Sequence, residues 1–187
     1  FQRMYENASS SAMRTTAQLG ILRCSQLLDN AENTIEAANK LLEDPNLAED
    51  IRKEALYCRA KMQLKNNQYG LAVVDLNPLA KEVRTAIGAE AKYLLAYCYF
   101  QLGSIELAEE EIMSFTKMQT SQQYWLAKSL ILLADINITR NDLFQAKQYL
   151  LALKGSYRQE DDIQSIILEK LAQIEEQETQ VTEEETL

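Results

Sequence analysis

The residue types that most often carry out catalysis are scarce in this chain of 187 residues. It contains no histidine, which removes the commonest general base and the usual partner of a serine or cysteine nucleophile. There is no glycine-rich phosphate loop and no EF-hand spacing of carboxylates. Neighbouring carboxylates such as Glu109–Glu111 diverge around a helix instead of converging on one proton or ion. We therefore predict a non-catalytic protein with no metal and no cofactor.

The cysteines are the remaining candidates for chemistry. Cys24, Cys58 and Cys98 form no CxxC pair, and an odd number cannot be fully paired within one chain. All three lie in apolar stretches with helical spacing. We therefore predict that they are small core residues.

A repeating pattern shows which elements must position the other residues. Three segments, 55–76, 91–112 and 129–150, align with each other. Each has a small residue in a first helix, a second small residue twelve positions later and a large apolar residue four positions after that. In order, these are Ala60, Ala72 and Leu76; Ala96, Ala108 and Ile112; Ala134, Ala146 and Leu150. The first small residues are 36 and 38 positions apart. Small residues at matched positions let two helices approach closely, so the pattern predicts stacked antiparallel helix pairs.

The breaks between the paired helices fall on residues that tolerate a left-handed backbone, Asn67, Gly103 and Asn141. Together these features resemble the tetratricopeptide repeat family, whose unit is about 34 residues long. The resemblance is best at Ala96, Tyr99, Gly103, Ala108 and Ile112. It implies an all-α, right-handed superhelical solenoid. This chain departs from the family in its longer period, in Arg59 and Gln63, which replace apolar residues, and in Trp125, which is not at the family's tryptophan position. Ankyrin repeats lack support because no TPLH-like segment occurs, and HEAT repeats would need longer spacings.

We expect the following organisation. Residues 1–8 form a tail or the end of a preceding helix, residues 9–158 form four helix pairs (9–45, 46–84, 85–119 and 120–158), residues 159–178 form a capping helix, and residues 179–187 form an acidic tail. In the first pair we expect helices over 16–29 and 35–43, a break at 30–33 and a cap among Ser9–Ser11. Either Thr34 or Ala37 could be its matched small residue. Pro78 should kink or end its helix.

The C-terminal part combines an apolar stripe with a run of negative charge. The stripe is Ile163, Ile166, Ile167, Leu171 and Ile174, at helical spacing within 161–174. It predicts a cap for the array; a homodimer contact is the alternative. Residues 171–187 contain six glutamates and no lysine or arginine, so we expect a solvated end, with docking to a basic partner as the alternative.

Composition also bears on the class of partner. The net charge is −9 and no basic stripe is present, which argues against a nucleic acid. The longest apolar run, 93–100, is far shorter than the roughly 20 residues of a membrane span, so we predict no direct membrane insertion. A protein or peptide is the expected partner.

In the resembled family the first helix of each pair lines a concave groove. Carrying those positions over gives Glu54, Tyr57, Lys61 and Leu64; Glu90, Tyr93, Tyr97 and Phe100; Lys128, Ile131, Asp135 and Ile138. From this set we predict the partner-binding residues Tyr57, Lys61, Tyr93, Tyr97, Phe100, Lys128 and Asp135. Packing in the core or between repeats is the alternative for Tyr93, Tyr97 and Phe100. The Asn and Lys pattern with which some members of the family hold a C-terminal carboxylate is not reproduced.

A narrower resemblance concerns cellular location. GAEAKYLLAYCYF, YWLAKSLILLADI and FQAKQYLLALK resemble the C-terminal part of long repeat proteins common in Bacteroidetes bacteria, over roughly residues 85–175. It implies a periplasmic or cell-envelope protein, with a cytoplasmic one as the alternative. Because the chain begins at Phe1, we expect it to be a piece of a longer protein. We therefore predict a scaffold that binds a protein segment; the alternative is an architectural spacer or oligomerisation module.

Overall fold

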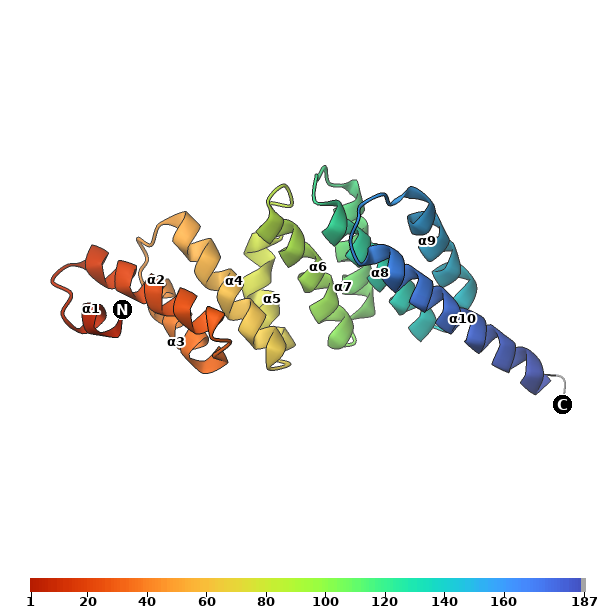
Figure 1. Cartoon of the computed structure of the whole chain (residues 1–187), viewed down its shortest axis with the longest axis horizontal. Coiled ribbons are helices and arrows are strands. Elements are labelled where there is room, and N and C mark those ends of the chain that lie inside the picture. The colour runs from red at the N-terminus through yellow and green to blue at the C-terminus, as the bar shows by residue number, and fades with distance from the viewer. Residues whose placement is uncertain (186–187) are drawn as a thin grey trace. The chain divides into compact units, whose positions relative to one another are not determined.

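The computed structural model describes the backbone of residues 1–185 and the side chains of residues 1–179, and this part of the chain is all-α (Figure 1). The ten helices, in order, are α1 (Gln2–Glu6), α2 (Ser11–Leu27), α3 (Ala31–Leu42), α4 (Glu49–Lys65), α5 (Tyr69–Leu79), α6 (Ala86–Gln101), α7 (Ile105–Lys117), α8 (Gln123–Thr139), α9 (Leu143–Ser156) and α10 (Ile163–Glu185). The chain divides into two compact units, Phe1–Lys81 and Glu82–Leu187.

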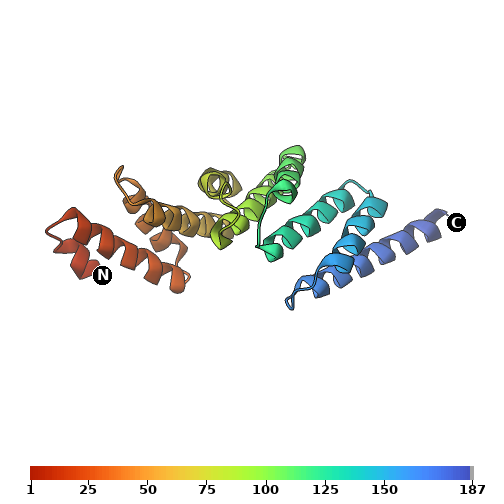
Figure 2. The ribbon, with the colours of Figure 1, turned by 90° about the horizontal axis from the view of Figure 1, so that it is seen from above.

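Helices that follow each other along the chain pack as antiparallel-like pairs. The pairs are α2 with α3 and α4 with α5 in the first unit, and α6 with α7 and α8 with α9 in the second, where α10 lies against α8 and α9 (Figure 2). The first helices of neighbouring pairs also touch: α2 contacts α4, α6 contacts α8, and α8 contacts α10. The prediction of an all-α array of sequential helix pairs is therefore confirmed, and the arrangement is consistent with a helical repeat.

The small and large residues of the repeating pattern form the centre of each pair. The six matched alanines are at most 1% exposed, and Leu76, Ile112 and Leu150 are fully buried. Because an alanine leaves room for the backbone opposite, the two helices of a pair come close, and the large residue fills the remaining space.

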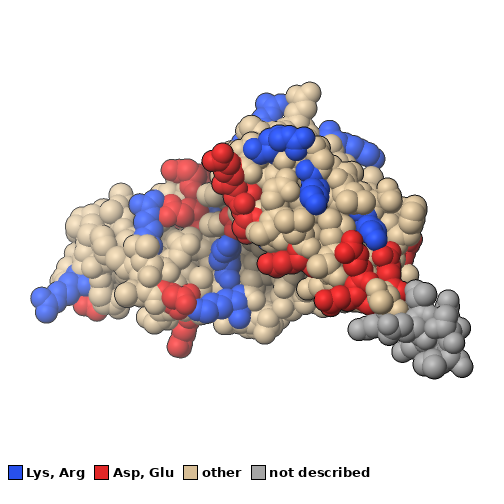
Figure 3. Space-filling model, turned by 45° about the vertical axis from the view of Figure 1, so that its right-hand side comes forward, with Lys and Arg blue, Asp and Glu red and all other residues tan. Residues whose placement is uncertain are grey.

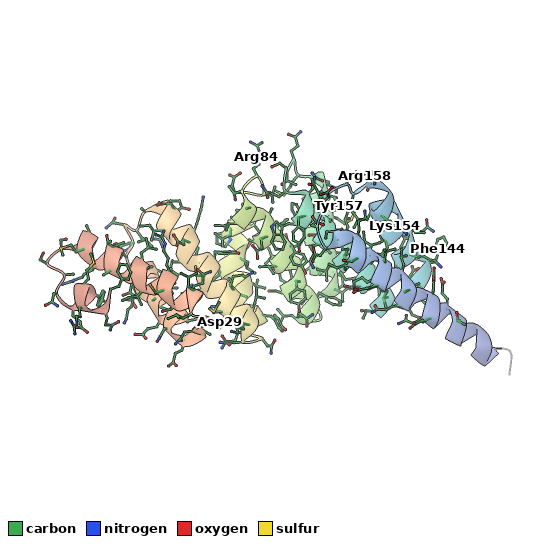
Figure 4. The ribbon with its side chains drawn as sticks, in the orientation of Figure 1. Asp29, Arg84, Phe144, Lys154, Tyr157 and Arg158 are labelled. Atoms are coloured by element: carbon green, nitrogen blue, oxygen red, sulfur yellow. The ribbon has the colours of Figure 1, made fainter. Side chains whose placement is uncertain are left out.

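The turn inside each pair has the same backbone geometry. Asp29, Asn67, Gly103 and Asn141 have positive φ angles of 55°, 56°, 73° and 60°. In each turn the next N–H donates to the carbonyl five residues earlier, at 2.8–2.9 Å, which closes a Schellman motif. The predicted breaks at Asn67, Gly103 and Asn141 are confirmed. The predicted break at residues 30–33 is wrong, because the left-handed residue is Asp29 (Figure 4) and α3 already begins at Ala31.

Asp29 fixes the register of the first pair. Counting from it as in the other pairs places Leu22, Thr34 and Ala38 at the matched positions, and all three are fully buried. Thr34 is therefore the equivalent of Ala72. The first pair has the large residue on its first helix and the small one on its second, in the opposite order to Ala60 and Leu76.

The ends of several helices follow the expected local chemistry. Ser10 caps α2 by accepting a hydrogen bond from the Met13 N–H at 3.2 Å, as predicted. The helix α5 ends at Leu79, one residue after Pro78. The last helix, α10, continues beyond the expected capping segment to Glu185, so residues 179–185 have helical backbone. Residues 186–187 of the predicted acidic tail lie outside the described residues.

The structure corrects one expectation about the cysteines. Cys58 and Cys98 are buried core residues, but Cys24 is exposed on α2. Leu22, two residues earlier, is fully buried, whereas the Cys24 side chain is exposed. Among the described residues, no helix is both long and apolar enough to cross a membrane.

Candidate partner-binding groove

The second unit contains an open groove of about 480 Å³ between α6, α8 and α10. We call it the α6–α8–α10 groove. It is lined by Tyr93, Tyr97, Phe100, Gln101, Lys128, Ile131, Leu132, Asp135, Ile138, Thr139, Ile166 and Lys170. Its lining therefore comes from the first helices of two adjacent pairs and from the C-terminal helix.

One wall of the groove is aromatic. The Tyr93 and Tyr97 rings, one helical turn apart on α6, have centroids 6.4 Å apart. Tyr93 also stacks on Trp125 of α8, with ring centroids 5.7 Å apart and planes 26° apart, and Tyr124 meets Trp125 edge to face at 4.9 Å. Such contacts restrict the rings before any partner arrives. Burial raises the pKa of the Tyr93 phenol to about 12, so the phenol stays neutral at physiological pH.

In the described part of the chain, the charged residues that line the groove are one carboxylate and two lysines, and only one of the lysines is in an ion pair. The Asp135 carboxylate forms an ion pair with Lys170 of α10, and both side chains are partly buried. Lys128 also lines the groove, but it forms no ion pair or hydrogen bond with any side chain that the structure describes. The lining residues therefore carry one uncompensated positive charge.

The structure brings together five of the seven predicted site residues. Tyr93, Tyr97, Phe100, Lys128 and Asp135 all line the α6–α8–α10 groove. Phe100 and the two tyrosines also pack against the buried cluster around Ala96 and Ile112, so they serve the core and the groove together.

The other two predicted residues, Tyr57 and Lys61, lie on α4 in the first unit. The Lys61 ammonium lies 5.8 Å from the centroid of the Tyr57 ring, a cation–π arrangement. Tyr57 also packs against the buried cluster of the first unit. Their role in binding stays a prediction.

Two contributions to the site do not follow from the sequence pattern. Ile166 and Lys170 belong to α10, whose apolar stripe predicts only a cap or a dimer contact. Trp125 was recognised only as lying off the family's tryptophan position, although it supports Tyr93. One signal for Lys170 was available: it follows Asp135 by about one repeat and has the opposite charge.

The apolar stripe of α10 is used within the chain. Ile163, Ile167, Leu171 and Ile174 are buried together with residues of α8 and α9, including Ala134 and Leu150. This leaves Ile166 beside the groove. A homodimer through α10 would have to use its other faces.

Two lysines of the second unit that lie outside the groove stand at helix ends. In Figure 3, acidic side chains gather towards the lower right of the view, and several basic ones lie towards its top. Lys117 and Lys154 are in the last turns of α7 and α9, where a positive charge stabilises the helix dipole. Figure 4 shows Lys154 and Arg158 near the end of α9. Lys117 and Lys154 therefore have a structural explanation.

The two buried thiols are unsuited to nucleophilic chemistry. Burial raises the pKa of Cys58 to about 11 and that of Cys98 to about 12, so both remain protonated at neutral pH. Cys58 donates a hydrogen bond to the side-chain oxygen of Gln26 at 3.0 Å.

In comparisons with known proteins, no family model, no curated protein and no solved structure matches this chain.

Proposed function

We propose that this chain is a non-catalytic scaffold that binds a segment of another protein in the α6–α8–α10 groove. The observation that carries the proposal is the convergence of Tyr93, Tyr97, Phe100, Lys128 and Asp135 on one open groove. Tyrosine provides a large contact area, a polar tip and few rotatable bonds, and it is enriched at the energetic centres of interfaces.

The architecture supports the same proposal. The helix pairs and their repeated turns are those expected of a tetratricopeptide-like superhelical solenoid, in which the first helices line a concave surface. The three helices of the groove fit this role, because α6 and α8 are first helices and α10 follows where the next first helix would stand. The resemblance to Bacteroidetes repeat proteins makes a cell-envelope assembly the proposed setting.

The test is affinity capture from an extract of the source organism, comparing the native chain with the Tyr93→Ala/Tyr97→Ala variant. We expect at least one protein to bind the native chain and to be lost from the variant. Because Tyr93 stacks on Trp125, circular dichroism must show that the variant remains folded at the temperature of capture.

Tyr99→Ala is the matched control. Tyr99 lies on the same helix and packs against the same buried cluster, but it does not line the groove. Its removal should leave capture unchanged. A partner retained by the double variant, or lost equally from Tyr99→Ala, would contradict the assignment of the groove.

A further inference from the structure

Charge pairs link neighbouring first helices in both units, but among the described residues the corresponding pair between α6 and α8 is missing at the groove. In the first unit, Arg23 of α2 forms a two-bonded ion pair with Glu54 of α4, at 2.6 and 2.7 Å. In the second unit, Asp135 of α8 pairs with Lys170 of α10. Each pair links one first helix to the helix that stands next to it.

The register shows that the first member of each of these pairs, Arg23 or Asp135, stands at a matched position. Arg23, Tyr97 and Asp135 each directly follow the residue that begins the pattern of their pair, namely Leu22, Ala96 and Ala134. Glu54 stands six residues before Ala60, which begins the pattern of its pair, and Lys128 stands six residues before Ala134, which begins the pattern of the next. At the step from α6 to α8, the two positions are therefore occupied by Tyr97 and Lys128, which cannot form an ion pair with each other.

Lys128 is consequently the one groove cation without a carboxylate among the described side chains, since Lys170 is paired with Asp135. Its side chain is only partly exposed. An ammonium group that is drawn further from water as a partner covers it needs an opposite charge to offset its lost hydration. The groove that Lys128 lines is otherwise rich in apolar and aromatic side chains, among them Ile131, Ile138 and Phe100.

We propose that the partner supplies the missing carboxylate: the groove binds a segment in which an Asp or Glu side chain, flanked by apolar residues, pairs with Lys128. This inference rests on the proposed binding function of the groove and names the chemistry of its ligand. The carboxylate comes from within the segment and not from its C-terminus. A terminal carboxylate is held by several donors together, whereas Lys128 is the only unpaired cation among the described residues that line the groove.

The test begins with a phage-displayed library of random peptides. It is selected on the native chain and counter-selected on Tyr93→Ala/Tyr97→Ala, so that only groove ligands are kept. We expect the selected sequences to share an acidic residue beside apolar ones. One such peptide is then synthesised with an amidated C-terminus, together with a version in which the acidic residue is replaced by its amide (Glu→Gln or Asp→Asn).

Binding of both peptides is measured by fluorescence anisotropy. Lys128→Gln should weaken the acidic peptide about tenfold, the amount expected for loss of one charge-assisted hydrogen bond, and should hardly affect the amide version. Lys128→Arg should restore most of the affinity for the acidic peptide. Lys154→Gln removes the same charge from the end of α9, outside the groove, and should change neither affinity.

The outcomes separate the two proposals. Selected peptides without an acidic preference, or equal weakening of both peptides by Lys128→Gln, would overturn the carboxylate pairing and leave the groove function standing. If no selected peptide distinguishes the native chain from Tyr93→Ala/Tyr97→Ala, the groove function and the pairing both fail.

Discussion

Leu22 and Ala38 occupy matched positions in the first helix pair, and their sizes are reversed relative to the other pairs. Ala60 with Leu76, Ala96 with Ile112, and Ala134 with Leu150 all have the small residue on the first helix. The combined volume of the two side chains is nearly conserved by the exchange. A core tolerates such an exchange because packing density depends on total volume as well as on the identity at each position.

This reversal predicts coupling between the two residues. Leu22→Ala should destabilise the chain by about 2–5 kcal/mol through the cavity it leaves, and Ala38→Leu by about 1–3 kcal/mol through overpacking. The double variant restores the order found in the other pairs, so its cost should be clearly less than the sum of the two. Urea unfolding of the three variants measures this.

The control combines Leu22→Ala with Leu150→Ala, a residue of the other unit. The two effects should simply add, since the residues belong to different buried clusters. An additive result for Leu22→Ala/Ala38→Leu would show that the two side chains do not fill a common space, and would contradict the register assigned from Asp29.

At the scale of elements, the turns between paired helices are more uniform than the helices themselves. All four place a left-handed residue directly after the helix cap and close with the same pair of backbone hydrogen bonds. Yet that residue is Asp, Asn, Gly or Asn. The conformation is therefore set by the closing hydrogen bonds, and each sequence tolerates it to a different degree.

Two glycine-to-alanine substitutions in the second unit separate the effect of backbone conformation on stability from the effect of steric clashes. An added Cβ would have nothing within 4 Å at either Gly103 or Gly155. At Gly103, with φ +73°, the change should destabilise by about 1 kcal/mol, the cost of a left-handed alanine. At Gly155, near the end of α9, it should stabilise by up to about 0.5–1 kcal/mol, because alanine loses less backbone entropy in a helix.

Thermal unfolding followed by circular dichroism distinguishes the two signs. Equal effects at Gly103 and Gly155 would contradict the assigned turn geometry. Asn141→Gly provides a further check, since glycine relieves the strain at that position and should not destabilise the turn.

The sequence was sufficient to predict the elements wherever the repeat was regular. The three later pairs and their turns could be placed because small, large and turn-forming residues recur together. The first pair could not, because Leu22 and Ala38 break the size pattern and Asp29 is a less obvious left-handed residue than Asn or Gly. In the site, residues from α6 and α8 were predicted by carrying over the groove positions of the resembled family. Ile166 and Lys170 were not, since α10 has no second helix to mark it as part of the repeat.

At the scale of the molecule, the chain consists of two compact units, each with buried clusters of its own. In arrays whose helices contact mainly their neighbours along the chain, stability is a sum of local terms, and a defect is felt most strongly nearby.

Hydrogen exchange should reveal this locality. Leu76→Ala, in the first unit, should accelerate amide exchange mainly in α2 to α5, whereas Leu150→Ala should do so mainly in α8 to α10. Both residues are fully buried and lose the same atoms, so each serves as the control for the other. If both variants accelerated exchange uniformly from α2 to α10, the chain would unfold as one cooperative body.

The last helix closes the hydrophobic core through Ile163, Ile167, Leu171 and Ile174, and it also supplies Ile166 and Lys170 to the groove. A segment bound in the groove would therefore stabilise the packed position of α10. Fraying of α10 and release of the occupant become linked events. A bound segment would shield the C-terminal region from proteases, and a chain trimmed before Ile163 would lose its terminal core and one side of its groove in a single cut.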